Sequence, residues 1–147
     1  MEELGNNYPN AKPFIQFEIT ESAYVGDTSE VFDRVRRIQE MGFKINMDDF
    51  GSGYSSLNLL KDAPIDIVKL DMGFLRGEEN GRNMDRGNII ISAVVNMTKQ
   101  LGFDIIAEGV ETKEQADLLA SMGCTAIQGF YYSRPKPEEE FTKLMQE

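Results

Sequence analysis

The chain has 147 residues, enough for one domain with a hydrophobic core, and 41% of them are hydrophobic. Its net charge of −10, without a basic stripe, argues against nucleic acid or an anionic membrane as a partner. The absence of histidine excludes a Ser-His triad and an imidazole base, which leaves the chemistry of carboxylates and lysines.

A single cysteine, Cys124, cannot form a disulfide within the chain, so we expect a reducing, cytoplasmic environment. No stretch approaches the ~18 apolar residues that a membrane-spanning helix needs, so we expect no membrane insertion by this segment. With no histidine and one cysteine, any catalytic metal must have oxygen ligands, which suit Mg²⁺ or Mn²⁺.

The first predicted strand runs from Phe14 to Ile19. Three later segments share one layout, in which a helix ends at a glycine and a short apolar run follows. These segments are 41–48 (MGFKINMD), 101–108 (LGFDIIAE) and, more loosely, 122–128 (MGCTAIQ). With a further apolar run at 65–70, they predict five strands, which begin near residues 14, 44, 65, 104 and 125.

Helices are predicted between the strands, where apolar residues recur at helical spacing or in dense apolar runs, over 31–41, 88–101 and up to Met122. Thr112 and Gln115 form the capping-box pattern that opens the last of these. A final helix is predicted over 138–146, and the charged stretch 76–86 is predicted to be a mobile loop. Alternating strands and helices indicate an α/β fold with a parallel sheet and right-handed crossovers.

Polar residues stand at the end of every predicted strand: Glu18 and Glu21, Asp48 and Asp49, Lys69 and Asp71, Glu108 and Glu111, and Gln128. In parallel α/β folds, ligands bind at the carboxyl ends of the strands. Several strands that end in carboxylates, together with a lysine in an apolar run, therefore predict one acidic metal site.

Five segments carry these residues: 18–21 (EITE), 48–57 (DDFGSGYSSL), 69–71 (KLD), 108–111 (EGVE) and 128–130 (QGF). In this order they resemble the motifs of the EAL-domain family of bacterial cyclic di-GMP phosphodiesterases. The resemblance extends from Phe14 to Pro135. It implies a TIM-type (β/α)₈ barrel, of which this chain supplies about five parallel strands with their helices and lacks the first strands.

The resemblance also implies how the chain is divided. Residues 1–13 would be the remnant of a preceding helix and loop, and residues 14–147 the carboxyl-terminal part of an EAL domain. The Glu-Ala-Leu motif of the family and a metal-ligating Asn lie on earlier strands, and neither occurs here. The parent protein can carry upstream domains that anchor it to a membrane.

By resemblance, Glu18 and Asp48 ligate a first metal ion, and Asp49 helps to hold a second. Lys69 orients the attacking water and balances charge that develops on phosphate. Glu108 is either a metal ligand or a base. The implied reaction is the hydrolysis of cyclic di-GMP to linear pGpG, with two Mg²⁺ or Mn²⁺ ions.

The remaining motif residues surround this centre in the family. Asp71, Glu111 and Gln128 complete the floor of the site. Glu21 anchors the loop that contains Phe50, Gly51, Ser52 and Gly53, and in the family this loop shapes the metal site and contributes to dimerisation.

Because two ligands of the family site are absent, we expect the isolated chain to be inactive, although its parent domain is an enzyme. The alternative is a module that binds cyclic di-GMP, regulates or dimerises without catalysis. The outer strands would expose unpaired edges, so we expect a homodimer or association with the missing half of the domain.

A third interpretation is a five-stranded receiver-like phosphoacceptor domain, which also combines an acidic pair, Mg²⁺ and a lysine. In receivers the acidic pair ends the first strand. Here Asp48 and Asp49 end the second predicted strand, which disfavours this interpretation.

Overall fold

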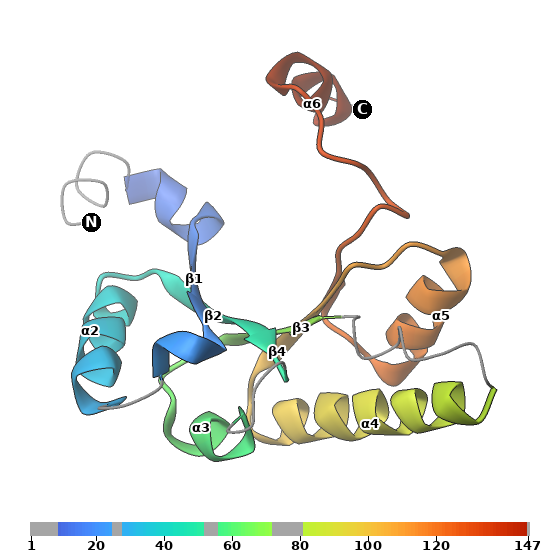
Figure 1. The fold of residues 1–147 in the computed structure, drawn as a ribbon. Coiled ribbons are helices and arrows are strands. Elements are labelled where there is room, and N and C mark those ends of the chain that lie inside the picture. The colour runs from blue at the N-terminus through green and yellow to red at the C-terminus, as the bar shows by residue number, and fades with distance from the viewer. Residues whose placement is uncertain (1–8, 25–27, 52–55, 72–80, 147) are drawn as a thin grey trace.

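The computed structural model describes residues 9–24, 28–51, 56–71 and 81–146. Its centre is one five-stranded parallel sheet in the order β1-β2-β3-β4-β5 (Figure 1). The strands are β1 (Gln16–Thr20), β2 (Lys44–Phe50), β3 (Ile67–Asp71), β4 (Asp104–Glu108) and β5 (Ala126–Ile127). The helices are η1 (Pro9–Phe14), η2 (Glu21–Tyr24), α2 (Thr28–Glu40), α3 (Ser56–Asp62), α4 (Gly81–Gln100), α5 (Lys113–Met122) and α6 (Glu138–Leu144).

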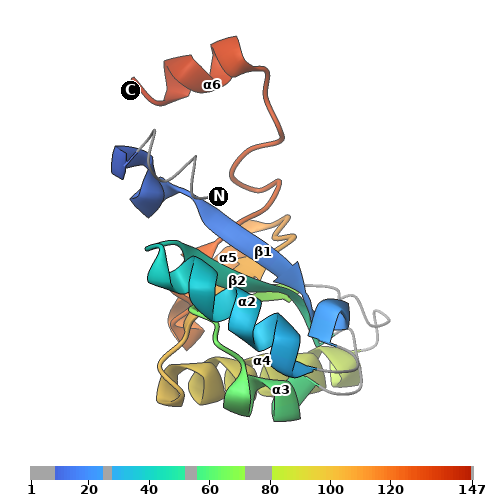
Figure 2. The same ribbon diagram turned by 90° about the vertical axis from the view of Figure 1, so that its left-hand side faces the viewer.

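Helices α2, α3, α4 and α5 lie along one side of the sheet, as Figures 1 and 2 show. Strands that follow one another in sequence order, with crossovers of one hand, place every connecting helix on the same side. A receiver-like domain has the strand order 2-1-3-4-5 instead, with helices on both faces. The receiver-like interpretation is therefore wrong, and the observed order is that of a barrel wall.

The hydrophobic core lies between the sheet and these helices. Alternate residues of each strand face it, such as Ile45 and Met47 on β2 and Val68 and Leu70 on β3. The residues between them face the opposite side of the sheet. Helix α6 lies on that side, away from α3 and α4 (Figure 2). Within the described ranges, no helix combines the length and apolar character that crossing a membrane requires.

The three glycines of the repeated layout end helices as predicted. Gly42, Gly102 and Gly123 have φ angles of 91°, 83° and 86°, a left-handed conformation that glycine adopts without steric cost. The predicted capping box is also present, because Thr112 accepts from the backbone N–H of Gln115 and the Gln115 side chain bonds back to the N-cap backbone. These signals set the helix ends from local chemistry alone.

Three predicted boundaries were wrong. Phe14 belongs to η1, which contains Pro13, so β1 begins only at Gln16. Ile65 still belongs to a turn, since its N–H donates to the Ala63 carbonyl, and β3 begins at Ile67. Helix α4 begins at residue 81, so 81–86 of the predicted mobile loop are helical, while 76–80 lie outside the described residues. A growing helix gains a hydrogen bond per residue and needs no apolar face to extend.

Strand β2 contains a bulge at its carboxyl end. Met47 pairs with Val68 and Phe50 with Leu70, so three steps along β2 match two steps along β3. The extra residue lets both Met47 and Phe50 face the core, although they are three positions apart. Asp48 and Asp49 are left together off the core, and Asp49 has a φ of 56°.

The loops that follow β4 and β5 are joined through their backbones. Val110 N–H donates to the Gln128 carbonyl at 3.2 Å, and Tyr131 N–H donates to the Val110 carbonyl at 3.0 Å. Gly129 makes this approach possible, because a Cβ there would lie 2.1 Å from the Val110 oxygen. The contact fixes the two loops relative to each other.

Substitutions at Asp49 test the bulge. We expect Asp49→Val to be less stable than Asp49→Gly by about 1–2 kcal/mol, because a β-branched residue is strained at positive φ. Urea denaturation measures both free energies of unfolding. The same two substitutions at Asp33, on the exposed surface of α2, serve as the control. There the glycine variant should be the less stable one, since glycine weakens a helix. Equal free energies of unfolding for Asp49→Val and Asp49→Gly would contradict the positive φ that the bulge gives to residue 49.

Substitutions of two glycines separate crowding from backbone strain. We expect Gly129→Ala to lower the free energy of unfolding by at least about 2 kcal/mol, because its Cβ meets backbone that cannot yield without moving a loop. At Gly102→Ala a Cβ meets nothing within 4 Å, so only the cost of positive φ remains, about 1 kcal/mol. A larger loss at Gly102 than at Gly129 in thermal or urea unfolding would refute the close approach.

Candidate active site at the strand tips

The polar face of the sheet carries the charged residues that the sequence singled out. Lys69 lies between Val68 and Leu70, which both face the core, so its side chain extends from the opposite face of β3. Glu18 holds the same position on β1, between two residues that pack on the core. Glu108 ends β4 directly after the buried Ala107. Strand alternation thus sends all three side chains to one side.

The Lys69 ammonium lies among three carboxylates. Its Nζ is 2.7 Å from Glu18 Oε1, 3.0 Å from Asp48 Oδ1 and 3.0 Å from Glu108 Oε1. The Lys69 side chain is only 7% exposed, whereas that of Glu18 is 52% exposed. Four neighbouring strands therefore contribute to one cluster, which we call the strand-tip cluster: Glu18, Asp48, Lys69 and Glu108.

Burial and charge act against each other on this lysine. Burial alone lowers the pKa of Lys69, but its contacts with Glu18, Glu108 and Asp48 outweigh burial and raise that pKa above its ordinary value. Burial raises the pKa of Glu108, and the neighbouring lysine offsets only part of the rise. With three ionised carboxylates and one ammonium, the formal charge of the cluster is −3 + 1 = −2. Such a site attracts cations.

Glu21 holds the beginning of the loop after the acidic pair. Its carboxylate is buried and accepts a hydrogen bond from the Gly51 N–H at 3.2 Å. Phe50 is buried in the core beside it. The predicted contact between Glu21 and this loop is therefore present at Gly51, while Ser52 and Gly53 lie outside the described residues.

The other predicted residues share the same edge of the sheet. Asp71 ends β3 and is the register partner of Glu108. Gln128 follows β5, and its N–H donates to the Ala107 carbonyl at 2.8 Å. Glu111 precedes α5, and its N–H donates to the side chain of Gln115. The structure thus brings the side chains of the strand-tip cluster into direct contact and places Asp71, Glu111 and Gln128 at the same edge of the sheet.

Asn46 belongs to the polar face but was missed from sequence. It is 2% exposed and donates from Nδ2 to Gln16 Oε1 at 2.8 Å. Its Oδ1 has no hydrogen-bond partner among the described residues. A polar residue in an otherwise apolar run, two positions before Asp48, was the signal that could have found it.

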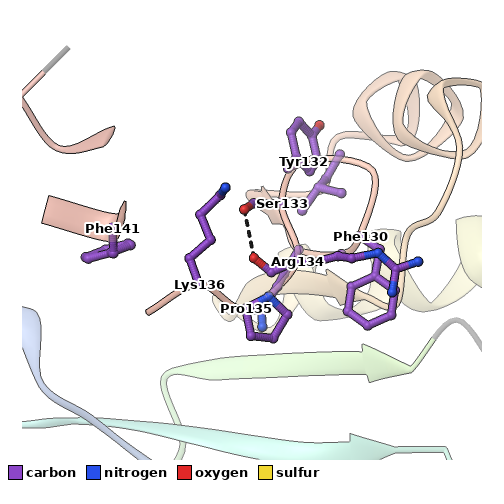
Figure 3. Close-up of a pocket in the computed structure, with 10 residues that line it drawn as sticks. Phe130, Tyr132, Ser133, Arg134, Pro135, Lys136 and Phe141 are labelled. Carbon is purple, nitrogen blue, oxygen red and sulfur yellow. Dashed lines mark hydrogen bonds between the residues drawn. The ribbon is translucent and has the colours of Figure 1, made fainter. Parts of the chain in front are cut away.

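A cavity of about 520 Å³ opens beside Gln128, between the loop after β5 and α6 (Figure 3). Phe130 and Arg134 line it, and the Arg134 guanidinium lies 4.6 Å from the centre of the Phe130 ring. Lys136 adds a second positive charge. This cavity is therefore aromatic and basic in a chain whose net charge is strongly negative, a combination that suits a flat, anionic ligand.

The cluster suits a metal by chemistry more than by its present spacing. All its donors are carboxylate oxygens, which hard divalent cations prefer. Within the described ranges, however, no three acidic or cysteine side chains are grouped as a metal site. The carboxylates close on the Lys69 ammonium instead. The residue types fit Mg²⁺ or Mn²⁺, and their arrangement fits an ammonium group.

Known proteins share both the sequence and the fold. The chain is 37% identical over 127 residues to the cyclic di-GMP phosphodiesterase RocR of Pseudomonas aeruginosa. The aligned region covers 86% of this chain and 32% of RocR. It is 40% identical over 128 residues to an uncharacterised signalling protein of Caulobacter vibrioides, covering 87% of this chain and 16% of that protein.

Solved structures agree. The PaMucR phosphodiesterase in complex with c-di-GMP superposes with a TM-score of 0.82 at 34% identity, over 95% of this chain and 56% of that one. The EAL domain of Mycobacterium smegmatis DcpA superposes with a TM-score of 0.77 at 36% identity, over 88% of this chain and 56% of that domain. The chain thus spans about half of these solved chains and a smaller share of its curated relatives. The sequence profile of the EAL domain matches residues 2–135, and the chain belongs to the EAL-domain family.

Proposed function

We propose that this chain forms part of a metal-dependent phosphodiesterase that hydrolyses cyclic di-GMP to linear pGpG. The observation that carries the proposal is the strand-tip cluster, in which side chains from four strands converge on one point. The names of relatives support the substrate, because RocR is a cyclic di-GMP phosphodiesterase and PaMucR was solved with c-di-GMP.

Glu18, Asp48 and Asp49 are the residues that would hold Mg²⁺ or Mn²⁺, with Glu108 as a further oxygen donor. When bound, two such ions supply positive charge to the phosphate and acidify a water molecule. The bulge supports this assignment for Asp49, because it keeps two successive carboxylates out of the core at the tip of β2. A regular strand would send one of them into the core.

Lys69 and Glu108 are suited to act on the attacking water. Lys69 extends from the strand tip and can donate to a water molecule or a phosphate oxygen. Glu108 Oε1 lies 3.0 Å from Lys69 Nζ, so the two groups are close enough for one water molecule to contact both. We assign Glu108 the removal of a proton from that water, with metal ligation as its alternative role.

The basic cavity beside Gln128 would take one half of the nucleotide. Its volume of about 520 Å³ lies within the range of small-molecule sites. The Phe130 ring offers a stacking surface and Arg134 a charge for phosphate. Gln128 lines the cavity and follows β5 at the edge of the sheet that carries the cluster, so we propose that a bound nucleotide reaches from one to the other.

A non-catalytic module that binds cyclic di-GMP or regulates a partner is the second candidate. It is favoured for residues 1–147 alone, because their sequence contains no Glu-Ala-Leu segment and because the chain matches 56% of the solved PaMucR chain. We propose that the cluster is competent for catalysis only when the remaining strands of a barrel complete it.

The isolated chain should therefore turn over little or no cyclic di-GMP. The measurement is chromatography of pGpG after incubation of purified residues 1–147 with cyclic di-GMP and Mn²⁺. RocR under the same conditions serves as the positive control. Hydrolysis by the isolated chain that EDTA abolishes would show that it needs no further strands.

A chimera tests the catalytic proposal itself. We expect a RocR chimera that carries residues 14–135 in place of the aligned segment to hydrolyse cyclic di-GMP. In it, Glu108→Gln should lower kcat about 10²-fold or more, as removal of a proton acceptor does. Asp104→Asn is the matched control, because Asp104 begins the same strand and pairs with the exposed Lys44. An inactive but folded chimera, or equal effects of the two substitutions, would refute the assignment.

A further inference from the structure

We propose that Lys69 competes with the divalent cation for the same carboxylates, so that a metal ion enters the strand-tip cluster only as the lysine ammonium withdraws. The lysine is then a built-in counter-ion of the metal-free protein as well as a group that acts on substrate. This inference rests on the proposed function for the identity of the metal ligands.

The distances set the two occupants in competition. Nζ lies within 3.0 Å of three carboxylate oxygens, and a magnesium ion binds such oxygens at ~2.1 Å. An ion on any of them would therefore stand within about 5 Å of the ammonium, and often much closer, which repels two cations strongly in a partly buried site. An ion therefore binds more readily once the lysine has moved away from these oxygens.

The formal charge of the cluster favours the divalent ion over the lysine. With the lysine, the three carboxylates keep a formal charge of −3 + 1 = −2, whereas one divalent ion without the lysine leaves −3 + 2 = −1. A metal ion therefore neutralises the carboxylates better, provided that its concentration offsets the loss of the lysine contacts. The competition sets a threshold for metal occupancy.

The fold offers the displaced ammonium an acceptor. Lys69 on β3 contacts Glu18 on β1, two strands away, so the pair spans the polar face of β2. Asn46 lies on that face, and its buried Oδ1 has no partner among the described residues. Because an unsatisfied buried acceptor costs free energy, an ammonium that leaves the carboxylates can gain by bonding to it.

The test is metal binding without nucleotide. Isothermal titration of residues 1–147 with Mn²⁺ measures the dissociation constant. For Lys69→Met it should be about one tenth of the value for the natural chain, or smaller, because a unit positive charge has been removed beside the ligands. Lys69→Arg keeps the charge and should bind no more tightly than the natural chain. Lys44→Met is the matched control, since Lys44 stands at the opposite end of β2, paired with Asp104 at 3.5 Å.

A second measurement covers the case in which Lys69→Met does not fold. In the natural chain labelled with ¹⁵N-lysine, the Lys69 Nζ resonance, assigned by its loss in Lys69→Arg, should shift on addition of Mg²⁺, while that of Lys44 should not. An unmoved Lys69 signal at saturating Mg²⁺, equal or weaker Mn²⁺ binding by folded Lys69→Met, or no binding by any variant would overturn the inference. Tighter Mn²⁺ binding by Lys69→Met alongside an inactive chimera would refute the phosphodiesterase proposal alone.

Discussion

The burial of one ammonium group among three carboxylates is the interaction on which the rest of this structure depends. A lysine that is 7% exposed would be costly without partners, and Lys69 has partners on β1, β2 and β4. The same contacts tie four adjacent strands together on the face opposite the hydrophobic core. The cluster therefore links the strands of the sheet by ion pairs, and it is also the centre of the candidate chemistry.

These ion pairs require that apolar residues face one side of the sheet and polar residues the other. Core residues such as Ile45 and Met47 alternate with polar residues such as Asn46 and Asp48 on β2. A slip of one residue in register would bury carboxylates among hydrophobic side chains. The glycines that end the preceding helices at 42 and 102 protect that register, because each fixes where its strand begins.

Much of this arrangement was predictable, because its signals are local in the sequence. An apolar run that ends in a charged residue identified Glu18, Asp48, Lys69 and Glu108, and glycine caps located β2 and β4. The bulge was not predictable, since the spacing of Met47 and Phe50 fits neither face of a regular strand. Nor could sequence show that Lys69 reaches across β2, because that contact depends on how neighbouring strands are paired.

Both flanks of the cluster are held by backbone contacts from loops rather than by the strands alone. On one flank, buried Glu21 fixes the Gly51 N–H and with it the turn that carries Asp49. On the other, the approach of Gly129 to Val110 fixes the chain just after Glu108. A lysine that must move when a cation enters needs neighbours that do not move with it. The rigid flanks therefore confine the change to one flexible side chain, and the carboxylates keep their places while their counter-ion is exchanged.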